Sequence, residues 1–213
     1  MGDSIADGVG ADPTGDGSDG LRYGGAALPA GVRLWDQGVE VFTWPDNAGA
    51  GPDPGYLPHL ALAALAAGFA AVHIVRYSTP GITTSTTRSS EWTQALQWMA
   101  ANNFVPDLVL IAAGTNDSQA GENSAFEASS SALARDCEGF PNARIGWLEP
   151  VALAAGSYPE ADLVRADIQA LQVGRTRFRV AGAGVGRADD AHPSLQGYKD
   201  QGAAIWPAYQ AAG

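Results

Sequence analysis

The regular alternation of helical and strand-like segments limits the fold of this chain more than any other feature. From about residue 57 onward, stretches with apolar residues at helical spacing are each followed by a short apolar run of strand length. The expected helices cover 55–69, 90–103, 124–137, 160–173 and 195–206, and the expected strands cover 70–78, 107–117, 143–151 and 177–185. This order predicts an α/β fold, a three-layer α/β/α sandwich with a mainly parallel, doubly wound (flavodoxin-like) sheet.

Several single residues predict where these segments begin and end. Gly68 is expected to end the first helix, Ser90 to cap the second, and Pro207 to close the last. Apolar and polar residues alternate over 32–44 on both sides of Asp36-Gln37-Gly38. This pattern predicts a small hairpin outside the main core.

Length and composition indicate one soluble globular domain over 1–213. The 23 acidic and 12 basic residues give a formal charge of −11, which argues against a nucleic-acid partner. No apolar run reaches the ~20 residues that a membrane span needs. The single cysteine, Cys137, rules out an internal disulfide and a cysteine-based zinc site. We expect no cofactor and no metal, because the acyl-transfer chemistry considered below requires neither.

The segment 7–20 is rich in Gly and Asp and has no periodicity, which is typical of an irregular surface loop. Its four Asp residues leave calcium binding open, although their spacing fits no standard calcium loop; they are Asp7, Asp12, Asp16 and Asp19. Residues 15–20 also match G-x-G-x-x-G, but they follow no strand and open no helix, so we reject a dinucleotide site.

Residues suited to acyl transfer gather at the predicted carboxyl ends of strands, where ligands bind in parallel sheets. A serine nucleophile needs a base, a carboxylate that orients the base, and donors for the developing oxyanion. Ser4 is the candidate nucleophile, His192 the base and Asp189 the orienting carboxylate. Gly81 and Asn116 lie on loops that can supply oxyanion donors.

Four ordered blocks resemble those of the SGNH, or GDSL, hydrolase superfamily. They are Gly2-Asp3-Ser4, the isolated Gly81, Gly114-Thr115-Asn116-Asp117, and the Asp-x-x-His of Asp189 to His192. The resemblance spans residues 2–198. It implies that Ser4 attacks an acyl carbonyl, that His192 accepts its proton and that Asp189 holds the imidazole. It also implies an oxyanion hole formed by the backbone N–H groups of Ser4 and Gly81 and by the side-chain amide of Asn116.

Each assignment has an alternative that the sequence leaves open. Ser4 can be a solvated terminal residue, Asn116 a turn former, and Asp190 the orienting carboxylate in place of Asp189. His59 and His73 are expected to be structural, because neither lies at the carboxyl end of a strand.

The start of the sequence departs from the superfamily pattern. Members place a buried strand in the middle of the sheet just before the Gly-Asp-Ser block, whereas only Met1 precedes it here. We therefore expect the domain to lack the usual first strand upstream of Gly2.

The substrate is inferred from weaker signals. No long apolar lid is evident, and the segment 44–65 followed by 72–81 is similar to the carbohydrate and sialate acetylesterase branches. The expected substrate is thus a small molecule or carbohydrate ester carrying a short acyl group, most simply acetyl. Trp35, Trp44 and Trp92 either stack on sugars or pack in the core. The alternatives are a longer-chain lipase-like esterase and a non-catalytic glycan-binding module.

Overall fold

The computed structural model describes Met1 and the segments 21–47, 55–79, 81–119, 121–151, 153–171, 177–182, 185–186 and 192–212. Among these, the side chains of 21–26, 45–47 and 195 are not described. Ser4, Asp189 and Asp190 lie outside the described residues, as do the four Asp residues of 7–20.

Parallel strands form the middle of the molecule in two groups. β6 (Leu108–Ile111), β7 (Arg144–Leu148) and β8 (Arg177–Val180) form one parallel sheet in that order. β2 (Val32–Asp36) pairs in parallel with β5 (Val72–Arg76) and antiparallel with β3 (Val39–Val41). A separate antiparallel ribbon joins β1 (Leu21–Ala27) to β4 (Thr43–Asn47).

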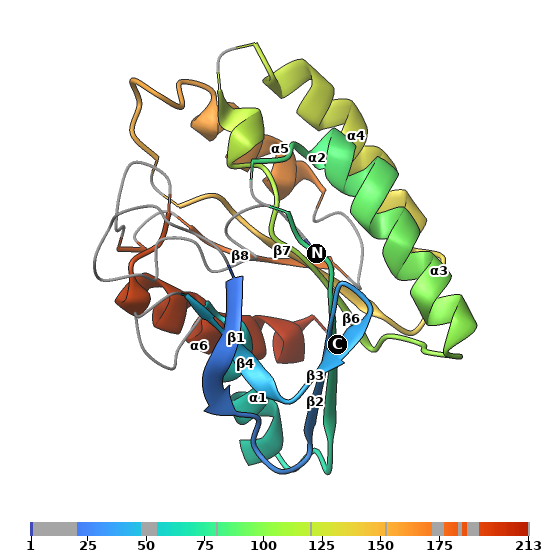
Figure 1. Ribbon diagram of the computed structural model, residues 1–213. Helices are drawn as coiled ribbons and strands as arrows, with labels where there is room; N and C mark the ends of the chain where they lie inside the picture. Colours follow the sequence, from blue (N-terminus) through green and yellow to red (C-terminus); the bar gives the residue numbers. More distant parts are fainter. Residues whose placement is uncertain are drawn as a thin grey trace.

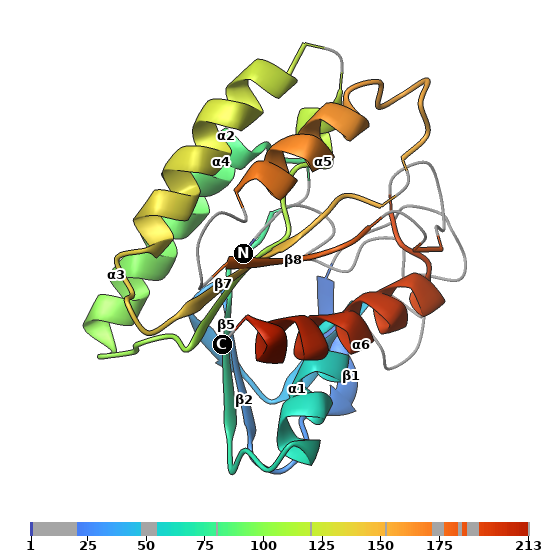
Figure 2. The same cartoon turned by 180° about the vertical axis from the view of Figure 1, so that it is seen from behind.

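Helices cover both faces of these strands (Figure 1). On one face lie α2 (Thr84–Thr86), the π-helical stretch η1 (Thr87–Trp92), α3 (Thr93–Ala101), α4 (Asn123–Cys137) and α5 (Ala161–Ala170). On the other face lie α1 (Leu57–Ala66) and α6 (Leu195–Ala211). Figure 2 shows the same two layers of helices from behind. The α/β class and the three layers predicted from the sequence are confirmed. None of the described helices is long and apolar enough to cross a membrane.

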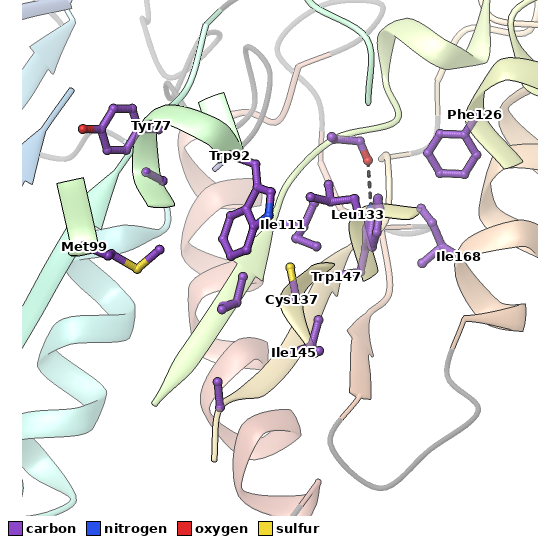
Figure 3. Packing of buried hydrophobic residues seen from close by; sticks show 14 of the residues in the cluster. Tyr77, Trp92, Met99, Ile111, Phe126, Leu133, Cys137, Ile145, Trp147 and Ile168 are labelled. Atoms are coloured by element: carbon purple, nitrogen blue, oxygen red, sulfur yellow. Dashed lines mark hydrogen bonds between the residues drawn. The ribbon is translucent and has the colours of Figure 1, made fainter. Parts of the chain in front are cut away.

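The largest apolar cluster lies between β6, β7 and the helices of the first face (Figure 3). Ile111, Phe126, Leu133 and Ile168 in this cluster have no solvent exposure. Trp147 packs edge-on against Phe126 at a ring-centroid distance of 6.0 Å, and its Nε1 donates to the carbonyl of Ala113 at 2.9 Å. Burial of these side chains fixes the carboxyl end of β6, from which a candidate site loop departs.

The predicted hairpin exists, but its expected position outside the main core was wrong. Gln37 and Gly38 both have positive φ, of 48° and 82°, as a two-residue hairpin turn requires. However, Val32 and Leu34 are buried in a second apolar cluster, because β2 also pairs with β5. The alternation of apolar and polar residues along β2 indicates that one face is buried. It does not indicate a parallel partner strand, which lies about forty residues later in the chain.

Two predicted helix boundaries were also wrong. Ser90 lies within η1 and caps nothing, since the helical segment already begins at Thr84. α6 continues through Pro207 to Ala211, and Tyr209 stacks against Trp206 at 5.3 Å and packs edge-on against Phe178. Packing of the last turn therefore outweighs the missing N–H of the proline. Gly68, with a φ of 95°, does lie just after the end of α1, as expected.

Candidate active site

Gly81 lies on the loop after β5 in a conformation that favours glycine. The φ of Gly81 is 79°, a value that residues with a side chain rarely adopt, and Gly81 is exposed. A Cβ built at this position would meet no atom of the described residues within 4 Å, apart from its two chain neighbours. Within the described part of the chain, the backbone at Gly81 is therefore uncovered, and a ligand can approach it closely.

Asn116 joins the loop after β6 to the loop that carries Gly81. It begins the 3₁₀ turn η2 (Asn116–Ser118), and its Nδ2 donates to the carbonyl of Ile82 at 2.9 Å. The two predicted oxyanion donors thus lie on loops that contact each other, although 34 residues separate the bonded groups. An amide nitrogen carries two hydrogens, so one remains for a second acceptor.

Asp117 makes the strongest connection between these two loops, which the sequence reasoning did not foresee. Its buried carboxylate accepts from the backbone N–H of Thr84 at 3.1 and 3.0 Å and from the Thr84 hydroxyl at 2.9 Å. Burial raises the pKa of Asp117, while the bonds from Thr84 act in the opposite direction. Because Thr84 is the first residue of α2, Asp117 caps that helix from another loop, which is the role predicted for Ser90.

Gly114 allows the loop after β6 to pass close to its neighbours. Its φ is 123°, and a Cβ there would come within 3.0 Å of Val164 Cγ1 and 3.4 Å of Pro150 Cγ. The Ser118 hydroxyl donates to the Gly114 carbonyl at 2.7 Å and closes the turn that presents Asn116. The Gly-Thr-Asn-Asp block is thus a tightly packed turn, in which Asn116 is half-buried.

His192 lies on the segment between β8 and α6 and is half-buried. Two residues later, Ser194 caps α6: its Oγ accepts from the Gly197 N–H at 3.1 Å. The Ser194 N–H donates to the Gly186 carbonyl at 2.8 Å, which ties this segment to the loop after β8. The described structure therefore brings Gly81 and Asn116 together and places His192 after β8, whereas the positions of Ser4 and Asp189 stay predictions.

Three buried charged residues stabilise the strand ends around these loops, and none of them was predicted. Glu149 directly follows β7 and accepts from Arg179 Nη1 at 2.6 Å and from the Gly182 N–H at 3.3 Å. Asp36 and Arg76 form a bidentate ion pair at 2.8 Å across β2 and β5. The sequence shows Asp36 just before the hairpin turn, but it does not show the partner of this carboxylate. Arg76 is the partner because the parallel pairing of β2 with β5 places the two residues opposite each other.

The other residues weighed from the sequence have structural positions. His73 lies in the middle of β5 with its ring 5.7 Å from that of Trp35, and His59 lies within α1. Trp44 and Trp92 are 4% and 3% exposed, so the structure contradicts a sugar-stacking role for both, and Trp35 packs on Trp98. Within the described segments, no three His, Cys, Asp or Glu residues gather to hold a metal ion.

The fold is similar to that of several solved structures, whereas the sequence matches no family model and no curated protein. A protein from Arabidopsis thaliana superposes with a TM-score of 0.68 at 14% identity, over 99% of this chain and 95% of that one. A carbohydrate acetylesterase family member from Sinorhizobium meliloti gives 0.64 at 15% identity, over 100% and 96%. A family two carbohydrate esterase from Clostridium thermocellum, solved with cellohexaose, gives 0.59 at 17%, over 96% of this chain and 60% of that one.

These similarities cover nearly the whole chain and therefore concern the complete α/β core. The chain has the fold of carbohydrate acetylesterases, as expected for the SGNH/GDSL-like hydrolase fold that its four sequence blocks resemble.

Proposed function

We propose that this protein is a serine esterase that removes short acyl groups, acetyl above all, from carbohydrates through an acyl-enzyme on Ser4. The hydrogen bond from Asn116 to the Ile82 carbonyl carries the proposal. It holds the Asn116 amide beside the loop of Gly81, and paired donors on adjacent loops are what an oxyanion needs. Within a fold shared with carbohydrate acetylesterases, this arrangement supports acyl transfer.

In the proposed reaction, the Ser4 hydroxyl attacks the ester carbonyl while neutral His192 takes its proton. Asp189 orients the imidazole and stabilises the imidazolium. The tetrahedral oxyanion accepts from the N–H groups of Ser4 and Gly81 and from the Asn116 amide. Collapse returns the proton to the departing sugar oxygen; a water molecule, deprotonated by His192, then attacks the acyl-serine and releases acetate and free Ser4.

The preference for a short acyl group rests on the open loop at Gly81. Gly81 is exposed, and no atom of the described residues beyond its chain neighbours lies within 4 Å of a Cβ built there. A long acyl chain needs an apolar groove at the reacting carbonyl to remove it from water, whereas acetyl does not. The carbohydrate part of the proposal rests on the structural neighbours, which include an esterase solved with cellohexaose.

The first experiment compares acetylated oligosaccharides with nitrophenyl esters of increasing chain length. We expect turnover of the acetyl compounds that falls as the acyl chain grows, and nearly complete loss in Ser4→Ala. Ser89→Ala is the matched control, because this exposed serine lies on η1. A preference for long chains would favour a lipase-like esterase; glycan binding without turnover would favour a binding module.

A second pair of variants tests the oxyanion role of Asn116. Removal of one such donor typically lowers kcat by about 100- to 1,000-fold, so we expect that loss in Asn116→Ala with a smaller change in KM. Asn102→Ala is the matched control, because exposed Asn102 also donates from Nδ2 to a backbone carbonyl, that of Trp98 at 2.8 Å. Equal kcat values in the two variants would refute the assignment.

A further inference from the structure

The turn between β2 and β3 lies at the same edge of the sheet as the candidate site. β2 and β5 run parallel, and their last residues, Asp36 and Arg76, stand opposite each other. Gln37 therefore follows β2 at the level where Tyr77 follows β5, and the loop that starts at Tyr77 leads to Gly81. Because ligands of parallel sheets bind at the carboxyl ends of the strands, the turn belongs to the rim of the candidate site.

Contacts from β5 and α3 hold this turn in place. The Gln37 N–H donates to the Arg76 carbonyl at 2.9 Å, and Trp98 Nε1 donates to the Gly38 carbonyl at 3.1 Å. Gly38 is closely packed, since a Cβ there would come within 2.9 Å of Tyr77 Oη and 3.1 Å of Trp98 Cδ1. The turn is therefore positioned before any ligand binds, which lowers the entropic cost of binding at a subsite.

Gln37 has a backbone conformation that its residue type disfavours. Its φ is 48°, and among the described residues Asn103 is the only other non-glycine residue with a positive φ. Gln37 is the first residue of a two-residue hairpin turn, a position that Gly, Asn and Asp fit best. Formation of the turn therefore does not explain a glutamine here. Residues held in such disfavoured conformations cluster at ligand-binding sites.

The side chain of Gln37 extends across the end of β5 and presents its amide at the surface. Gln37 is exposed, and its Nε2 donates to the carbonyl of Ser78 at 2.6 Å. Because a carbonyl oxygen can only accept, this bond determines which end of the amide is the nitrogen. Within the described part of the chain, Ser78 is the hydrogen-bond partner of this amide. The Oε1 acceptor and the second Nε2 hydrogen are thus available to a ligand, in a fixed orientation.

We infer that Gln37 is a specificity-determining residue whose amide binds hydroxyl groups of a carbohydrate substrate, beside the reacting carbonyl. One acceptor and one donor on a planar amide match two neighbouring sugar hydroxyls, one of which donates while the other accepts. Ser78 precedes Gly81 by three residues, a path of at most about 11 Å. This reach suits a short oligosaccharide and exceeds an acetyl group. The inference rests on the proposed esterase function and concerns the sugar part of the substrate.

Gln37→Met tests the subsite, because methionine keeps the length of the side chain and removes both polar groups. We expect kcat/KM for monoacetylated cellotriose to fall by about 3- to 10-fold, mainly through KM, as the loss of one or two hydrogen bonds implies. The fall should be smaller for acetylated glucose and smallest for nitrophenyl acetate. Gln94→Met is the matched control, because exposed Gln94 also donates from Nε2, to Ser90 Oγ at 3.1 Å. An equal fall for all three esters would show that Gln37 only supports the loop of Gly81, and no fall would show that it contacts no substrate; both results overturn the inference.

Two further measurements separate this role from turn geometry and from the esterase proposal. Gln37→Gly removes the amide but suits the positive φ, so it should change the substrate preference as Gln37→Met does; the preference of the wild type in Gln37→Gly would overturn the inference. Calorimetry with unacetylated cellotriose needs no turnover: its Kd should rise by about 3- to 10-fold in Gln37→Met, and an equal Kd, or no binding to the wild type, would overturn the inference. A wild type that hydrolyses none of the three esters contradicts the proposed function, whereas hydrolysis with an unchanged preference in Gln37→Met contradicts only the role of Gln37.

Discussion

Replacing Asp117 by Ala removes the carboxylate that links the Gly81 loop to the Asn116 loop. Two donors lose their acceptor, the N–H and the hydroxyl of Thr84, and Thr84 is fully buried. Hydrogen bonds to a charged group contribute about 1.5–3 kcal/mol each. Part of this is offset because burial of the ionised carboxylate is itself unfavourable, so we expect a net loss of about 2–4 kcal/mol in the free energy of unfolding.

For a domain of this size, that loss corresponds to a fall of roughly 4–16 °C in the thermal midpoint. Asp136→Ala is the matched control, because Asp136 pairs with Arg88 at 2.7 Å on the surface, where such pairs contribute about 0–1 kcal/mol. Calorimetry and urea unfolding of both variants give the comparison. If Asp117→Ala shifts the midpoint no more than Asp136→Ala, the carboxylate does not hold the two loops.

The pH dependence of Asp117→Asn tests the same group with less disturbance. Burial raises the native pKa of Asp117 above the ordinary value of 3.8. Between these two values the native state therefore binds more protons than the unfolded state, so the contribution of this group to stability falls as pH rises. We expect the stability of the wild type relative to Asp117→Asn to increase from neutral to mildly acidic pH. A difference that is constant, or that shrinks on acidification, would contradict the direction of the shift.

Three further predictions concern packing away from the reaction. Gly114→Ala should lower the free energy of unfolding by about 2–5 kcal/mol in a urea titration, since it combines a φ of 123° with a 3.0 Å approach to Val164. Gly156→Ala is its control and should change that free energy by less than about 0.5 kcal/mol, because no described atom beyond its chain neighbours lies within 4 Å of the added Cβ. Pro207→Ala should stabilise α6 by about 1–3 kcal/mol, because it supplies the missing N–H to the Ala203 carbonyl, and a lower midpoint would show that the proline is required. Burial raises the pKa of the Cys137 thiol to about 12, so a thiol reagent at mildly alkaline pH should label the protein only after unfolding.

The helices and strands from residue 55 onward could be predicted because their signals are local. Ala- and Leu-rich spacing marks α1, and apolar runs mark β6 and β7, with Gly68 after the end of the first helix. The errors came from contacts between distant segments. β2 was assigned to a peripheral hairpin because its parallel pairing with β5 leaves no local trace, and the end of α6 was misplaced because packing of Tyr209 outweighs the proline.

In the candidate site, too, local motifs were predicted correctly, whereas contacts between distant segments were missed. Gly81 and Asn116 were predicted from short motifs, and their loops do meet. The groups that hold the loops were missed, because the link from Asp117 to Thr84 spans 33 residues and the bond from Arg179 to Glu149 spans 30. The position of an Asp or Glu in the sequence does not indicate which distant donor its carboxylate will bind. The motifs therefore predicted which two loops meet, but not the side chains that hold these loops together.

Covalent labelling at Ser4 tests the central claim most directly. A fluorophosphonate reacts with an activated serine in an oxyanion hole, and mass spectrometry of the digested protein locates the adduct. We predict one adduct on the peptide that contains Ser4, its loss in Ser4→Ala, and strongly slowed labelling in His192→Ala. An adduct on a different residue, or labelling that persists in Ser4→Ala, would show that the amino-terminal serine is not the nucleophile.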